Sequence, residues 1–263
     1  MKNLHLLLLI LFASCTQDKD PEIVGTTEEF VLKSDIINDD YTIYVYLPQN
    51  YSNEPVNQLV IGLDGDLRFK TIANLISKKV QYGNMPPCIF IGVGNGSERN
   101  RDYTPTAYKN GSGGADNFYL FLKDELIPEL ESRYNIDKSN NKTLIGHSFG
   151  GLFTQYVMAK ERASNPFNKF VAIGTSYWYD SGIIFEYEKN YASTHSDLPV
   201  TFFNAMGTLE GGVLLASFEE MNQILDSRAF PNFEHQSEYI KKSGHSGSAE
   251  EGFKKGLDYV FSK

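Results

Sequence analysis

The sequence is poor in cysteine, has no cluster of basic residues, and has no apolar run long enough to cross a bilayer comfortably. Only Cys15 and Cys88 are cysteines among its 263 residues, so no framework of structural disulfides is expected. Asp and Glu number 33 against 24 Lys and Arg, which gives a formal net charge of -9. This balance excludes nucleic acid, or an anionic membrane surface, as a partner recognised by charge.

Signals for metals and nucleotide cofactors are also missing. No His, Cys and carboxylate side chains show the spacing of metal ligands, so we predict no metal. The glycine-rich segment 92–97 has Ser97 where a dinucleotide fingerprint needs its third glycine. Segment 110–115 lacks the Gly-Lys-Ser/Thr ending of a phosphate loop, and we predict no cofactor. Cys88 opens an apolar run and is expected to be a small buried hydrophobe.

The N-terminus has the pattern of an export signal. Lys2 is followed by the apolar stretch LHLLLLILFAS, which has signal-peptide length and is too short for a comfortable span. Small residues precede Cys15, as in a bacterial lipoprotein signal. We predict a signal peptide over 1–15 with lipidation at Cys15, a tether over 16–29, and a protein exported to the bacterial cell envelope, on its periplasmic or its surface-facing side. A plain secretory signal with a chance cysteine is the alternative.

Residues 30–263 are predicted to form one α/β domain. An N-terminal antiparallel hairpin is expected from two β-rich runs, 30–33 and 41–47. Five apolar runs then resemble strands buried on both faces: QLVIGLDG, CIFIGVG, KTLIGHS, KFVAIGTS and VTFFNAMG. Helices are expected at about 69–80, 116–133, 149–161, 182–192, 213–229 and 249–261, with Asp116 able to cap the second. This alternation predicts a mostly parallel central sheet with helices on both faces and ligands beyond its carboxyl ends.

The stretch KTLIGHSFGGLFTQYVM, residues 142–158, contains the pattern Gly-x-Ser-x-Gly around Ser148. A strand that turns this tightly into a helix presents its serine at the top of the sheet. A serine hydroxyl is a poor nucleophile until a base takes its proton and an acid orients that base. The neighbouring His147 is expected to point elsewhere on so sharp a turn.

Both partners of the serine are found downstream in the order serine, acid, histidine that α/β-hydrolases use. Glu210 follows the strand-like run VTFFNA, and His245 lies in a loop between a final strand candidate at 233–240 and the last helix. We predict His245 as the base and Glu210 as the acid. Asp226 and Glu219 are the alternatives for the acid.

An acyl-transfer site also needs donors for the developing oxyanion. The amide of Phe149, directly after the nucleophile, is the expected first donor. The second is expected from LDGDL, residues 63–67, where Asp-Gly exposes the backbone. We predict the Asp66 amide, with Leu67 as the alternative, and an ordinary Asp-Gly turn is the competing interpretation.

The segments LDGD, RNRDYTPT, GGADNFYLFLKDELIPELESRY, GHSFGGLF and GHSG together resemble the putative esterase family of α/β-hydrolases, over about 30–261. This family includes esterase D-like, enterochelin esterase-like and feruloyl esterase-like members. The resemblance implies an α/β-hydrolase fold and hydrolysis of carboxylic esters without a cofactor, with Ser148 and His245 in the nucleophile and base positions. It also places Arg101 near the active-site cleft, although pairing with Asp102 to hold a long loop is an equal alternative. Trp178 is expected either to line an acyl or aryl pocket or to pack a lid.

We therefore expect a serine esterase that acts on a small-molecule or glycan-linked ester and contacts the membrane only through its lipid anchor. Two alternatives stay open: a hydrolase fold that binds a ligand without turnover, and an acyltransferase or thioesterase that uses the same residues. The sequence indicates neither the substrate nor the oligomeric state.

Overall fold

The computed structural model describes residues 23–49, 51, 56–137 and 142–262. The predicted signal peptide, its Cys15 and the first part of the predicted tether lie outside these residues. The main sheet has eight strands in the order β1-β2-β4-β3-β7-β8-β9-β10. Its strands are β1 (Gly25–Ser34), β2 (Asp39–Pro48), β3 (Leu59–Gly62), β4 (Ile89–Val93), β7 (Lys142–His147), β8 (Phe167–Ile173), β9 (Val200–Gly207) and β10 (Phe233–Ile240). A separate two-stranded ribbon pairs β5 (Ala107–Tyr108) with β6 (Gly111–Ser112).

The predicted sheet topology is confirmed. Strands β1 and β2 form an antiparallel hairpin, and β2 pairs antiparallel with β4. From β4 through β10 every neighbouring pair is parallel. Parallel strands bring their carboxyl ends to one edge, so the loops that follow β3, β7, β8, β9 and β10 gather there.

The helices are α1 (Gly65–Gln81), α2 (Arg99–Tyr103), α3 (Ala115–Leu120), α4 (Ile127–Arg133), α5 (Phe149–Met158), α6 (Ile183–Thr194), α7 (Gly212–Arg228) and α8 (Ala249–Phe261). Each of the six expected helical segments is helical. The segment 116–133 contains one π-helical turn, Phe121–Leu126, between α3 and α4. The short helix α2 and the β5-β6 ribbon were not expected, because two to five residues carry too little periodicity to detect.

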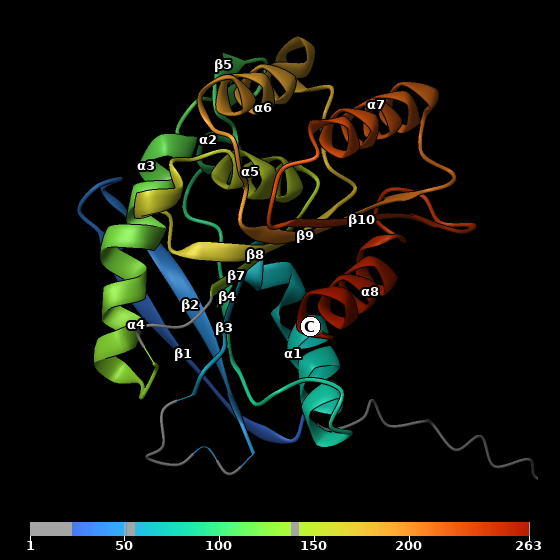
Figure 1. Ribbon diagram of the computed structural model, residues 1–263. Coiled ribbons are helices and arrows are strands. Elements are labelled where there is room, and N and C mark those ends of the chain that lie inside the picture. The colour runs from blue at the N-terminus through green and yellow to red at the C-terminus, as the bar shows by residue number, and fades with distance from the viewer. Residues whose placement is uncertain (1–22, 50, 52–55, 138–141, 263) are drawn as a thin grey trace, which may run out of the picture.

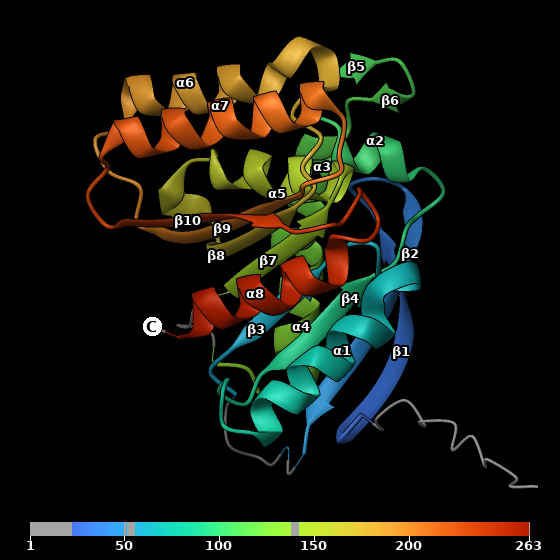
Figure 2. The same ribbon diagram turned by 90° about the vertical axis from the view of Figure 1, so that its right-hand side faces the viewer.

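Two apolar cores lie on the two faces of the sheet. One face packs against α1 and α8, through side chains such as Ile76 and Leu257. The other packs against α3, α4 and α5, through side chains such as Phe118 and Leu152. Figures 1 and 2 show these helices on opposite sides of the sheet and show α6 and α7 side by side as an outer layer over α5. Because side chains alternate along a strand, neighbouring strand residues serve different cores. Cys88 is fully buried, as expected.

Two expectations about local structure are wrong. The sheet begins before Phe30, because β1 starts at Gly25 and its first residues pair with the end of β2. Residues 25–29 of the expected tether therefore belong to the domain. Asp116 does not cap its helix, since Gly114 holds the N-cap position. The Asp116 carboxylate instead accepts hydrogen bonds from Tyr156 and Lys160.

Among the described residues, no helix has the length and apolar character needed to span a bilayer.

Candidate active site

Ser148 lies at a sharp turn between β7 and α5. Its backbone has φ 62° and ψ -119°, a conformation that a residue with a side chain adopts only under strain. The turn is tight enough that a Cβ on Gly146 would stand 2.2 Å from the carbonyl oxygen of Gly150. The Ser148 amide donates to the carbonyl of Ile173 on β8, at 2.9 Å. These constraints hold the hydroxyl at the carboxyl edge of the sheet.

His245 lies in the loop between β10 and α8 and faces Ser148. Its Nε2 is 2.8 Å from Ser148 Oγ, and its Nδ1 is 2.9 Å from Glu210 Oε2. A carboxylate only accepts hydrogen bonds, so Nδ1 carries the proton and Nε2 offers its lone pair to the serine hydroxyl. The structure therefore brings together Ser148, His245 and Glu210 in the geometry of a base between a nucleophile and an acid.

Glu210 is the acid that contacts His245, and the two alternatives lie elsewhere. Its side chain is fully buried, and its Oε1 accepts from the Gly207 amide at 3.2 Å. Asp226 contacts His235, while Glu219 accepts from Tyr239. Burial removes competing water from the Glu210 carboxylate, which strengthens its hold on the imidazole.

The expected oxyanion donors stand at the first turns of two helices. Phe149 is the first residue of α5 and Asp66 the second of α1. The first turn of an α-helix leaves its N–H groups without a partner inside the helix. The alternative donor, the Leu67 amide, is already engaged with the carbonyl of Asp64 at 3.0 Å. The Asp66 carboxylate accepts from Tyr44 Oη and from the Asn95 amide, and these bonds fix the first turn of α1.

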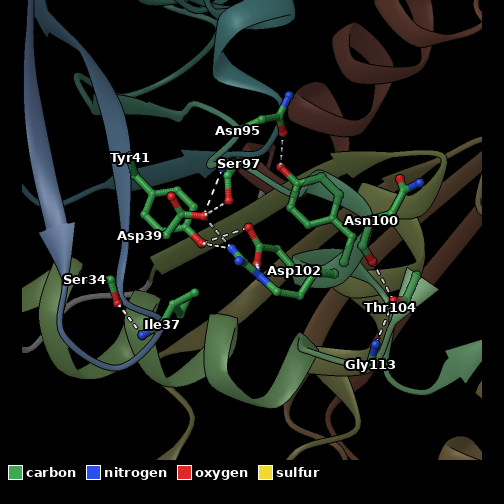
Figure 3. A network of polar contacts seen from close by, with 12 residues as sticks. Ser34, Ile37, Asp39, Tyr41, Asn95, Ser97, Asn100, Asp102, Thr104 and Gly113 are labelled. Atoms are coloured by element: carbon green, nitrogen blue, oxygen red, sulfur yellow. Dashed lines mark hydrogen bonds and ion pairs between the residues drawn. The ribbon is translucent and has the colours of Figure 1, made fainter. Parts of the chain in front are cut away.

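Arg101 belongs to a polar network that holds its loop on the start of β2. It donates from Nε to Asp102 at 2.7 Å and from Nη2 to Asp39 at 2.8 Å. Figure 3 shows Asp39, Tyr41, Ser97 and Asp102 converging on this network. Tyr41 Oη donates to Asp102 at 2.8 Å. Of the two alternatives for Arg101, the structure shows the pairing with Asp102, and the guanidinium is committed to these carboxylates.

Arg99, which the sequence did not single out, is bound to the turn at the start of α1. Arg99 makes a two-pronged ion pair with the buried carboxylate of Asp64, with Nη2 and Oδ2 2.8 Å apart. Asp64 is the N-cap of α1 and has a left-handed backbone, and its amide donates to Tyr103 Oη. The pair thus ties the Arg99 loop to the turn that carries Asp66.

Trp178 lines a cleft of about 560 Å³ formed with residues of α6 and α7. Its ring centroid lies 6.0 Å from that of Phe149, and Ser176, two residues earlier, has its Oγ 3.4 Å from Ser148 Oγ. The Lys109 ammonium stands 5.4 Å from the centre of the Trp178 ring. The remaining lining residues include aromatic, apolar and acidic side chains: Tyr177, Asp180, Ser181, Gly182, Ile183, Phe185, Glu186, Val213, Ser217 and Glu220.

His147 packs against His245, a contact that the sequence did not predict. Its ring centroid lies 4.7 Å from that of His245, and its Nε2 is 2.8 Å from the backbone oxygen of His245. The sequence does not reveal this contact, because His147 and Ser148 are adjacent and yet both contact the loop that carries His245. Within the described part of the chain, no three His, Cys, Asp or Glu side chains gather where they could hold a metal ion.

Comparison with known proteins supports the family assignment. Residues 34–172, more than half of the chain, match the family described as Putative esterase. The chain is 26% identical over 207 residues to the ferri-bacillibactin esterase BesA of Bacillus subtilis, covering 70% of this chain and 71% of that protein. It is 23% identical over 189 residues to a siderophore triacetylfusarinine C esterase of Aspergillus fumigatus, covering 66% of this chain and 64% of that protein.

Solved structures show the same fold. The BES protein from Bacillus cereus superposes with a TM-score of 0.80 at 24% identity, covering 93% of this chain and 99% of that one. An IroE-like serine hydrolase from Shewanella oneidensis gives a TM-score of 0.82 at 24% identity, covering 90% and 80%. The expected α/β-hydrolase fold is thereby confirmed. The chain belongs to the putative esterase family and is, by class, a carboxylic ester hydrolase.

Proposed function

We propose that the protein is a serine esterase that works through an acyl-enzyme on Ser148. The single observation that carries this proposal is the unbroken line of hydrogen bonds from Ser148 Oγ through the His245 imidazole to the buried Glu210 carboxylate. In this proposal His245 takes the serine proton as Oγ attacks the ester carbonyl, and Glu210 stabilises the imidazolium that forms. His245 then returns the proton to the leaving alcohol.

The tetrahedral oxyanion is held, in this proposal, by the amides of Phe149 and Asp66. Both amides belong to helix N-termini, where the helix dipole adds to the hydrogen bond. A water molecule activated by His245 then attacks the acyl-enzyme and releases the acid. Every proton is carried by protein groups and water, so the scheme needs no cofactor.

For the substrate we propose a bulky, ring-containing ester of the siderophore type. Two considerations support this class. The two curated relatives are named as a ferri-bacillibactin esterase and a siderophore triacetylfusarinine C esterase. Trp178 lines a cleft, packs against Phe149 beside Ser148, and has the Lys109 ammonium over its ring. Aromatic rings stack on such faces, and anionic ring substituents are attracted by the ammonium.

A fluorophosphonate probe tests the esterase proposal directly. An activated serine is labelled covalently, and labelling should disappear in Ser148→Ala. Well-folded wild-type protein that resists the probe would favour a module that binds without turnover. Thioester hydrolysis or acyl transfer would be recognised from the acyl donor and acceptor consumed.

The substrate class is tested with a panel of esters: p-nitrophenyl acetate, acetylated and feruloylated sugars, and a tricatecholate lactone. We expect Trp178→Ala to raise KM for the ring-containing esters by about tenfold, on the scale of one lost aromatic contact. Turnover of p-nitrophenyl acetate should stay near wild type. An equal effect on all esters would contradict the role of Trp178 in specificity.

We also propose that the protein is exported and anchored in the cell envelope through an acylated Cys15. The pattern of residues 1–15 supports this proposal. Metabolic labelling with a fatty-acid analogue should mark the wild-type protein and not Cys15→Ser. If neither the wild-type protein nor Cys15→Ser is labelled, a plain secretory signal is favoured.

A further inference from the structure

His147 directly precedes Ser148 in the sequence, and its side chain contacts the backbone of His245. It is the last residue of β7 and is buried. Its Nε2 is 2.8 Å from the carbonyl oxygen of His245, and its Nδ1 is 2.9 Å from Nη2 of Arg68 on α1. The imidazole therefore bridges α1 and the loop that carries His245, from the position directly before Ser148.

The partners of the ring determine its tautomer. The His245 carbonyl can only accept, so Nε2 of His147 carries the hydrogen and donates it. Arg68 can only donate, so Nδ1 of His147 accepts through its lone pair. Each of the two bonds thus requires the same neutral ring. Burial, with a further contribution from the Arg68 charge, lowers the pKa of His147 to about 3, which agrees with that assignment.

The His245 carbonyl is held by a second donor as well. Ser248 Oγ, at the N-cap of α8, donates to the same oxygen at 2.9 Å. Gly174 allows the two rings to approach, because a Cβ there would stand 3.2 Å from His147 Nε2 and 3.3 Å from His245 Nδ1. The backbone of the base is therefore fixed from the side of the nucleophile and from the side of α8.

We propose that His147 is a positioning residue that keeps the His245 imidazole in its place beside Ser148 throughout the reaction. This inference rests on the proposed function of Ser148 and His245. The direct bond between Ser148 Oγ and His245 Nε2 is lost once the serine is acylated, whereas the bond from His147 to the His245 backbone does not depend on the serine hydroxyl. It holds the base where the deacylating water needs it.

Two substitutions of similar size separate this role from simple packing. In His147→Gln, the amide nitrogen reaches about as far as the histidine Nε2 and can still donate to the His245 carbonyl. In His147→Asn, the shorter amide cannot reach it. His235→Gln is a control, because the His235 side chain is also largely buried and its contacts, Asp226 and Asn204, lie outside the site.

We would measure kcat and KM for p-nitrophenyl butyrate, the rate of fluorophosphonate labelling, and the melting temperature. Misplacement of a catalytic group by about 1 Å can lower the rate by about a hundredfold. We therefore expect His147→Asn to lower kcat by about ten- to a hundredfold with KM within about twofold of wild type. His147→Gln should recover most of this loss, and His235→Gln should match wild type.

Equal activity of the Asn and Gln variants, whether both high or both low, would overturn the inference. If His147→Asn does not fold, Arg68→Met tests the same bridge from its other end, and a kcat equal to wild type would overturn the inference. Absence of labelling in the wild-type protein would instead reject the proposed function. If the wild-type protein is labelled but the two His147 variants have equal kcat values, only the positioning role is rejected.

Discussion

Glu210 and His245 lie 35 residues apart in sequence, and Glu210 Oε2 is 2.9 Å from His245 Nδ1. Their strands explain this proximity. Glu210 follows β9 and His245 follows β10, and the two strands pair in parallel up to Gly207 and Ile240. The Leu209 amide also donates to the Ser243 carbonyl at 2.9 Å. The two loops are therefore joined before their side chains meet.

We expect Glu210→Gln to lower kcat by about 10³-fold, with KM changed by less than about threefold. The neutral amide cannot stabilise the imidazolium, and its NH₂ group can favour the wrong tautomer of His245. The measurement is the hydrolysis of a p-nitrophenyl ester by protein of confirmed melting temperature. Glu219→Gln is the matched control, since that exposed carboxylate contacts Tyr239 and Gln223. A loss of less than tenfold in Glu210→Gln would show that another group orients the base.

The sheet and the three central residues could be predicted because their signals are local and periodic. Strands such as β7 and β8 are short apolar runs buried on both faces, and buried parallel strands have that composition. Once the strands are ordered in parallel, residues just after them must share one edge. Ser148 is predicted from its Gly-x-Ser-x-Gly pattern, and Glu210 and His245 from their places after strands in the chain order of an α/β-hydrolase, without any knowledge of side-chain orientation.

Features that depend on side-chain direction or on contacts with exposed strands could not be predicted. Residues 25–29 are polar and exposed, so their pairing in an edge strand leaves no apolar alternation in the sequence. Asp116 was a plausible cap by residue type, but its carboxylate has stronger partners in Tyr156 and Lys160. The bridge from Arg68 to His147 joins positions 79 residues apart, and no spacing rule links them.

We expect Arg99→Met to lower the free energy of unfolding by about 3 kcal/mol, because it leaves the buried Asp64 carboxylate without its counter-ion. The Asp64 side chain is only 4% exposed and that of Arg99 is 30% exposed, so water replaces the lost partner only in part. Urea unfolding would measure the change. Lys254→Met is the control, because Lys254 and Glu251 are both about half exposed and 3.5 Å apart. That pair should contribute less than about 1 kcal/mol, and equal losses in the two variants would contradict the special role of the buried pair.

We expect the stability of the wild-type protein to fall more steeply with acid than that of His147→Gln. The pKa of His147 is lowered from 6.5 to about 3 in the folded protein, mainly by burial and also by Arg68. Above pH 6.5 the ring is neutral in both states. Between pH 6.5 and 3 the unfolded chain binds a proton that the folded protein rejects, so stability is lost as the pH falls.

Urea unfolding at pH 6 and pH 4 measures this effect. One extra proton bound by the unfolded state corresponds to about 1.4 kcal/mol per pH unit. The wild-type protein should therefore lose about 2 to 3 kcal/mol more than His147→Gln over this interval. All other titrating groups are shared by the two proteins, so their contributions largely cancel. Parallel losses would mean that His147 is protonated as easily in the folded protein as in the unfolded chain.

We expect Ser148→Gly to be more stable than Ser148→Ala by about 1 to 2 kcal/mol, although both variants should be inactive. The backbone at φ 62° and ψ -119° strains any residue with a Cβ and suits glycine. Alanine keeps the strain while removing the hydroxyl, whereas glycine removes both. The same pair of substitutions at Ser262, where φ is -76°, should show no advantage for glycine, because that backbone is unstrained. If Ser148→Gly were the less stable of the two variants in urea unfolding, the turn would hold no strain.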